Sequence, residues 1–134
     1  MSNANQSVVE RAYESFQLGD IDSVLGALTD DVTWTVIGPA DASPLFGERR
    51  GHAGAAEYLR LFAEQLELQV FKIDRFVAQG DTVVALGHSD GTVRKSGKPL
   101  AVDWAHVFTL RDGKICAYQE FIDSALIAKT MLAA

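Results

Sequence analysis

The chain has 134 residues, of which 48% are hydrophobic and 22% charged, and its formal net charge is −6. This length predicts one domain over residues 1–134, and the apolar fraction excludes a disordered chain. An acidic chain lacks the basic surface that nucleic acids require, so nucleic acid is excluded as a partner. The sequence shows neither a membrane-span-length apolar run nor a signal peptide, so we expect no membrane partner and a cytoplasmic location.

The first part of the chain predicts two helices and a strand. Apolar residues recur at helical spacing over residues 9–16, and Asn5 or Ser7 is placed to cap that helix. A second, short helix is predicted over residues 21–28. Residues 32–37 are rich in β-branched and aromatic side chains, which is typical of a strand.

The remainder predicts a loop, a helix, four strands and a final helix. Residues 38–51 contain two prolines and three glycines, so we expect a long irregular loop of the kind that often forms a lid or a pocket rim. A helix is predicted at 53–66, strands at 68–78, 82–93, 100–110 and 115–123, and a closing helix at 125–131. Helices followed by an antiparallel meander predict the α+β fold class.

The turns of the meander predict which side chains share a face of the sheet. Asp-Gly at 112–113 is typical of a two-residue hairpin, which places His106 opposite Gln119. A second turn, centred near Gly97, places His88 opposite His106. One face then collects Leu86, His88, Trp104, His106, Phe108, Gln119, Phe121 and Asp123, whereas the other carries Cys116, Tyr118 and Glu120 among smaller residues. We expect helices to cover the first face. Its several polar groups predict a cavity there, because burying an unpaired polar group costs about 1–3 kcal/mol.

Short motifs follow one another along the chain in a distinctive order. They are Leu18-Gly19-Asp20, Leu28-Thr29-Asp30-Asp31-Val32-Thr33-Trp34, Gly51-His52-Ala53-Gly54, Gly80-Asp81-Thr82-Val83-Val84, the stretch from Trp104 to Ile115, and Glu120-Phe121-Ile122-Asp123. Their order and spacing resemble the SnoaL-like branch of the nuclear transport factor 2-like superfamily, which includes ketosteroid isomerases, limonene epoxide hydrolase and polyketide cyclases. The resemblance implies a cone-shaped, bent antiparallel sheet covered by N-terminal helices around an internal pocket, and a homodimer through the convex sheet face.

The chemistry that the resemblance implies transfers only in part. The oxyanion-hole tyrosine and the base aspartate of ketosteroid isomerases fall at Ala12 and Val36, and their second acid falls near His106. The last strand is similar to the one that carries a catalytic aspartate in limonene epoxide hydrolase, and Asp123 matches it. The resemblance thus implies a small hydrophobic ligand and, for an enzyme, cofactor-independent isomerase, hydrolase or cyclase chemistry. The alternative is a non-catalytic ligand-binding or dimeric interaction module of the same fold.

His106 and Asp123 are the predicted catalytic pair, because an imidazole titrates near neutral pH and a carboxyl in an apolar setting can exchange a proton. Each also has a structural interpretation: His106 as a core histidine bonded to Gln119 or His88, and Asp123 as the N-cap of the last helix. The predicted ligand-binding residues are Trp34, His88, Trp104, Phe121, Gln119, Tyr13, Phe16, Tyr58 and Phe62. No cofactor is expected, and no metal, since the spacing of His88, His106 and Asp123 matches no metal-binding motif.

Overall fold

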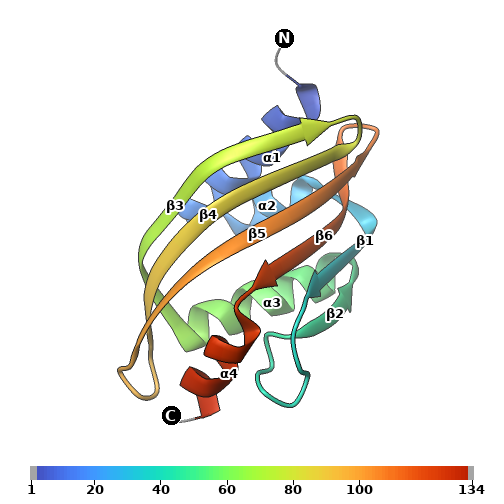
Figure 1. Ribbon diagram of the computed structural model, residues 1–134. Helices are drawn as coiled ribbons and strands as arrows, with labels where there is room; N and C mark the ends of the chain where they lie inside the picture. Colours follow the sequence, from blue (N-terminus) through green and yellow to red (C-terminus); the bar gives the residue numbers. More distant parts are fainter. Residues whose placement is uncertain (1–2, 133–134) are drawn as a thin grey trace.

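The computed structural model describes residues 3–132 and shows an α+β fold in which helices lie against one face of a curved sheet (Figure 1). In chain order the elements are α1 (Ala4–Gln17), α2 (Ile21–Gly26), β1 (Leu28–Val36), β2 (Gly47–Arg50), α3 (Gly51–Gln65), β3 (Leu66–Gln79), β4 (Thr82–Val93), β5 (Pro99–Arg111), β6 (Lys114–Ile122) and α4 (Ser124–Leu132). Strand β2 lies within the segment predicted to be wholly a loop; the other predicted elements are present with shifted ends. Among the helices of the described part, none has the length and apolar character that crossing a bilayer demands.

The strands form one open sheet in the order β2-β1-β6-β5-β4-β3. The predicted antiparallel meander is confirmed for β3 to β6. Strand β1 instead pairs in parallel with β6, and β2 folds back antiparallel on β1. This parallel pair places Trp34 beside Tyr118, so an aromatic residue from the start of the chain lies next to one near its end.

Two helices deliver tyrosines to the sheet. Helix α1 begins after Asn3, whose side chain accepts hydrogen bonds from the two backbone N–H groups of residues 5 and 6, so the predicted caps Asn5 and Ser7 are wrong. The buried face of α1 includes Tyr13, and that of α3 includes Tyr58. Both tyrosines therefore lie against what we call the inner face of the sheet, which is the face that the helices cover; the opposite face is the outer face.

The predicted register between the last two strands is wrong by one residue. The hairpin turn forms as expected, but a β-bulge at Cys116 follows it and inserts one extra residue into β6. Beyond the bulge His106 lies opposite Glu120 rather than Gln119. Because successive side chains on a strand point to opposite faces, the bulge brings Glu120 to the inner face and moves Gln119 and Phe121 to the outer face.

The β4–β5 register also differs from the prediction. Gly87 lies opposite Trp104, and His88 lies opposite Asp103 on the outer face. Ser89 takes an inner position in place of His88. Glycine is required at 87, because a Cβ there would lie 2.4 Å from the indole ring of Trp104 and 2.4 Å from a backbone oxygen of β3. The missing side chain thus lets the indole lie flat across β4.

Candidate functional site

An apolar cavity of about 110 Å³ lies between the inner face of the sheet and the helices. This volume is well above the 10–15 Å³ or so that one water molecule needs, so the cavity has room for a small organic molecule. The aromatic side chains in its lining are Tyr13, Phe16, Trp34, Phe46, Tyr58, Phe62, Phe71, Trp104, Phe108 and Tyr118. Among the described residues that line it, Glu120 alone has a carboxyl group, and none is a lysine or an arginine.

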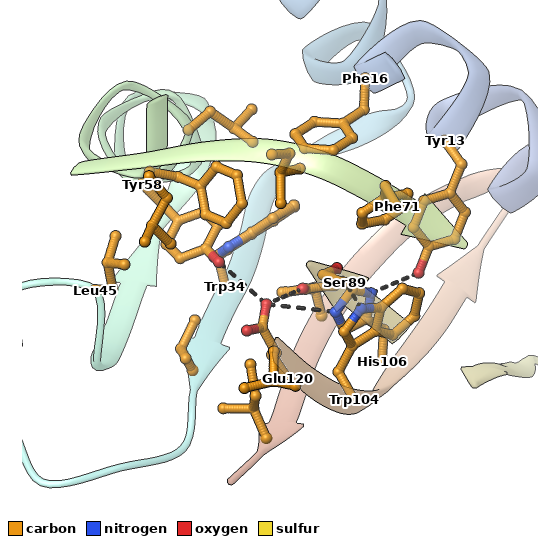
Figure 2. Close-up of a pocket in the computed structure, with 18 of the residues that line it drawn as sticks. Tyr13, Phe16, Trp34, Leu45, Tyr58, Phe71, Ser89, Trp104, His106 and Glu120 are labelled. Atoms are coloured by element: carbon orange, nitrogen blue, oxygen red, sulfur yellow. Dashed lines mark hydrogen bonds and ion pairs between the residues drawn. The ribbon is translucent and has the colours of Figure 1, made fainter. Parts of the chain in front are cut away.

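Glu120 lies at the centre of the polar groups in this cavity (Figure 2). Its side chain is only 10% exposed. Its Oε1 accepts hydrogen bonds from the hydroxyl of Tyr118 at 2.5 Å and from that of Tyr58 at 3.1 Å. Its Oε2 receives no hydrogen bond from any residue in the described range 3–132. Burial raises the pKa of Glu120, and the two tyrosine hydroxyls offset this only in part because they stabilise the charged form. The carboxyl therefore keeps its proton to higher pH than an exposed glutamate does.

His106 stands between Glu120 and Tyr13. The Tyr13 hydroxyl lies 2.6 Å from Nδ1, and Nε2 lies 3.5 Å from Glu120 Oε1 (Figure 2). Burial lowers the pKa of His106 from 6.5 to about 3, so the imidazole is neutral at neutral pH. When Nδ1 accepts a hydrogen bond from the hydroxyl of Tyr13, the single ring proton is on Nε2 and faces the carboxyl. Tyr13, His106 and Glu120 thus form a continuous polar chain in an otherwise apolar wall.

Aromatic stacking fixes the orientation of His106 and of Tyr118. The rings of Trp104 and His106 are stacked with their centroids 4.0 Å apart and an interplanar angle of 10°, and Trp104 Nε1 donates to Ser89 Oγ at 2.8 Å. Trp34 stacks on Tyr118, also at 4.0 Å. The Nε1 of Trp34 is buried and has no hydrogen-bond partner among the described residues, an arrangement that costs about 1–3 kcal/mol.

Many of the predicted site residues lie in this cavity. Its lining contains the predicted catalytic residue His106. It also contains six of the predicted ligand-binding residues, which are Tyr13, Phe16, Trp34, Tyr58, Phe62 and Trp104. Ala12 and Val36, the positions of the ketosteroid isomerase tyrosine and aspartate, also line it with apolar side chains. The tyrosine hydroxyl near the start of the chain comes instead from the next residue, Tyr13.

Three predicted residues of β6 and its end lie outside the cavity lining. Gln119 and Phe121 are exposed on the outer face because of the bulge. Asp123 follows β6 and caps α4, since its Oδ1 accepts from the backbone N–H of Leu126 at 3.0 Å. His106 and Asp123 are therefore not brought together, and the carboxyl beside His106 is Glu120.

His88 also lies away from the cavity, on the outer face. Its Nδ1 is 2.8 Å from Asp103 and its Nε2 is 2.8 Å from Asp90. The hydrogen bond with Asp103, followed by that with Asp90, raises the pKa of His88. His88 and His106 thus occupy opposite faces of the sheet and cannot share a ligand.

Sequence reasoning missed the two polar residues of β6 that the cavity contains, Tyr118 and Glu120. Apolar residues occupy both alternating sets of positions in this strand, so hydrophobic alternation did not identify its inner face. One usable signal was present. Tyr118 and Glu120 are two residues apart, so both side chains lie on the same face of the strand, where the tyrosine hydroxyl can donate to the carboxylate.

A curved, unclosed sheet covered by helices around an apolar cavity is the architecture of nuclear transport factor 2-like proteins. The chain belongs to the SnoaL-like domain family, whose model matches residues 9–118, and this confirms the resemblance seen in the sequence. No curated protein is similar enough to count as a match.

Solved structures of similar chains cover almost the whole length. A nuclear transport factor 2-like protein of unknown function from Burkholderia pseudomallei is 25% identical, with 97% of this chain and 98% of that chain covered and a TM-score of 0.89. One from Burkholderia xenovorans is 28% identical, with 98% of each chain covered and a TM-score of 0.88. TerC, co-crystallised with polyporic acid, is 26% identical, with 98% of this chain and 100% of that chain covered and a TM-score of 0.85.

Proposed function

We propose that this protein binds a small, uncharged, hydrophobic molecule in the cavity and exchanges a proton with it through Glu120, without a cofactor. One observation carries the proposal: a buried carboxyl has one oxygen held by two tyrosines and the other free of protein partners, within an apolar cavity. The reaction class that fits is isomerisation or cyclisation by proton transfer.

The lining of the cavity favours an uncharged ligand. The described lining residues include no cation that would offset the charge of a ligand anion. Aromatic walls favour a flat, apolar ligand, because each Å² of apolar surface removed from water contributes about 25 cal/mol. The co-crystallisation of TerC with polyporic acid supports a small organic ligand. A carbonyl oxygen is the group that a protonated Glu120 would recognise.

The proposed step uses the two oxygens of Glu120 differently. The protonated carboxyl donates its proton from Oε2 to the ligand. The carboxylate that remains keeps the hydroxyl bonds of Tyr58 and Tyr118 on Oε1 and gains the facing N–H of His106. A proton from another atom of the ligand then returns to the carboxylate, so the ligand is rearranged and the protein is restored. His106 acts as a positioning donor here, and Asp123 has no part in the reaction.

Hydrogen exchange of a simple ketone tests the proposal. The chain has two tryptophans, Trp34 and Trp104, and both line the cavity, so quenching of their fluorescence by 2-acetonaphthone reports binding. In D₂O the bound ketone should exchange its methyl hydrogens faster than in buffer, as followed by NMR. Glu120→Gln should bind the ketone and lose the exchange. Glu64→Gln, which changes an exposed glutamate of α3, is the matched control.

The possible results separate the two functions of the cavity. If the wild type and Glu120→Gln exchanged the methyl hydrogens of the ketone at the same rate, catalysis by Glu120 would be refuted. If the wild type bound the ketone without this exchange, the protein would be a ligand-binding module. Comparison with 2-ethylnaphthalene, which lacks the oxygen, isolates the hydrogen bond to Glu120. Glu120→Leu should weaken binding of the ketone about two- to tenfold more than binding of the hydrocarbon.

We also propose that two copies of the chain pair through the outer face. Val70, Val77 and Phe121 are large apolar side chains on this face, and each is more than 40% exposed. Burying them against a second copy would remove this surface from water. Light scattering should give the mass of two chains, and Phe121→Asp should shift it toward one. A monomeric wild type would refute the dimer.

A further inference from the structure

We infer that residues 38–46 form a lid over the cavity and that Arg49 is the latch that holds this lid closed. Residues 38–46 connect β1 to β2. The inference rests on the proposed function only in requiring that a ligand pass into the cavity.

The lid is the part of the cavity wall that belongs to no helix or strand. Leu45 and Phe46 line the cavity from this segment, and both are buried. Every other described lining residue belongs to a helix or a strand. Residues 38–46 can therefore move without breaking the backbone hydrogen bonds of any helix or strand.

Arg49 supplies the connection between the lid and the rest of the protein. Within the lid, the turns are closed by hydrogen bonds from Ala42 N–H to the oxygen of Pro39 and from Phe46 N–H to that of Ser43. Among the described residues, the only hydrogen bonds that join residues 38–46 to the remainder of the chain come from the Arg49 guanidinium. They go to the backbone oxygens of Pro44 and, at 3.3 Å, Leu45.

The other contacts of Arg49 lead to the site itself. Its Nε donates to Glu57 at 3.2 Å, and its guanidinium lies 5.9 Å from the centroid of the Tyr58 ring. Tyr58 in turn donates to Glu120. One side chain thus joins the lid to the helix that carries a hydrogen-bond donor of the candidate acid. Its neighbour Arg50 is 76% exposed, against 12% for Arg49, which shows how differently the two arginines are used.

The first residue of the lid is a glycine, and another glycine directly follows its last residue. Gly47 has a φ of +112°, a conformation that other residues rarely adopt. At Gly38 a Cβ would lie 2.5 Å from the ring of Phe46, so the closed lid packs this ring directly on the glycine backbone. Gly38→Ala should consequently push the lid open without altering Arg49.

Binding kinetics separate a latch from a purely structural contact. Stopped-flow quenching of tryptophan fluorescence by 2-acetonaphthone gives the association and dissociation rate constants. Arg49→Met removes the two charge-assisted hydrogen bonds to the lid and the one to the exposed Glu57, so both rate constants should rise about tenfold or more while Kd changes little. Gly38→Ala should show the same pattern, and Arg50→Met should leave both constants unchanged. A rise in the dissociation rate constant alone, or no change, would overturn the latch.

Hydrogen exchange at Trp34 tests the lid without any ligand. The Nε1–H of Trp34 is buried and unpartnered, so its exchange with water requires opening, and its NMR signal is one of two indole signals. Arg49→Met and Gly38→Ala should speed this exchange about tenfold, with the slowest amides of β4 and β5 unchanged. Unchanged exchange at Trp34 would overturn the lid. If the ketone does not bind the wild type but Trp34 exchange accelerates in the variants, the lid stands and the proposed function fails.

Discussion

The buried imidazole of His106 predicts a large loss of stability in acid. Burial lowers its pKa from 6.5 to about 3, a difference of 6.5 − 3 = 3.5. In the unfolded chain the pKa returns to about 6.5, so between these values the unfolded chain binds a proton that the folded chain does not. The contribution of His106 is therefore complete above about pH 6.5 and is lost as the pH falls toward 3. At 1.36 kcal/mol per pKa unit it amounts to about 5 kcal/mol, as much as the whole stability of many small domains.

Urea unfolding from about pH 7.5 to about pH 4.5 measures this effect. The free energy of unfolding of the wild type should fall steeply over this range, whereas His106→Gln should lower it at neutral pH and flatten its dependence on pH. His88→Gln is the control of opposite sign. The raised pKa of His88 means that its contribution is present below the unfolded pKa and is lost as the pH rises, so this variant should be weakened in acid only. Parallel curves for the wild type and His106→Gln would refute the reasoning.

Three further changes probe the cavity and its surroundings. Because the pKa of Glu120 is raised, its contribution is complete below the unfolded pKa and falls as the pH rises through the folded one. In urea unfolding, Glu120→Gln should therefore gain stability relative to the wild type as the pH rises from about 5 to about 8, and a difference between the two proteins that does not change with pH would contradict a buried carboxyl. Gly87→Ala places a methyl group against Trp104 and should lower stability by about 1–3 kcal/mol in thermal unfolding; an unchanged Tm would contradict this packing. Asp123→Ala should cost about 1 kcal/mol as a lost helix cap, with unchanged affinity for 2-acetonaphthone, and a lost affinity would return Asp123 to the site.

The sequence predicted the parts of the fold that depend on local patterns. Helical spacing located α1 and α3, and the Asp-Gly turn located the β5–β6 hairpin. The inner face of β5 was predicted correctly for Trp104 and His106, because large aromatic residues alternate there with smaller ones. These patterns extend over several residues, so an error at one position does not reverse them.

The features that the sequence did not predict depend on single residues or on distant contacts. One extra residue at Cys116 changed the face of Glu120, and no composition signal marks it. His88 pairs with Asp103 rather than with His106, a shift of three residues along β5, and this shift places His88 on the outer face. Strand β2 is short and lies within a proline- and glycine-rich segment, and its pairing with β1 stabilises it only once the sheet has formed. Local propensity carries no information about such partners.

The bulge at Cys116 decides which polar side chain of β6 enters the cavity. If the same β6 sequence paired with β5 without the bulge, it would form a regular ladder from the hairpin turn onward, with no substitution at any cavity position. Gln119 and Phe121 would then face the helices, and Glu120 would face outward. The cavity would contain an amide where it now has an acid, and the proposed proton transfer through Glu120 would be gone. One residue left unpaired beside a turn thus gives the cavity its acid.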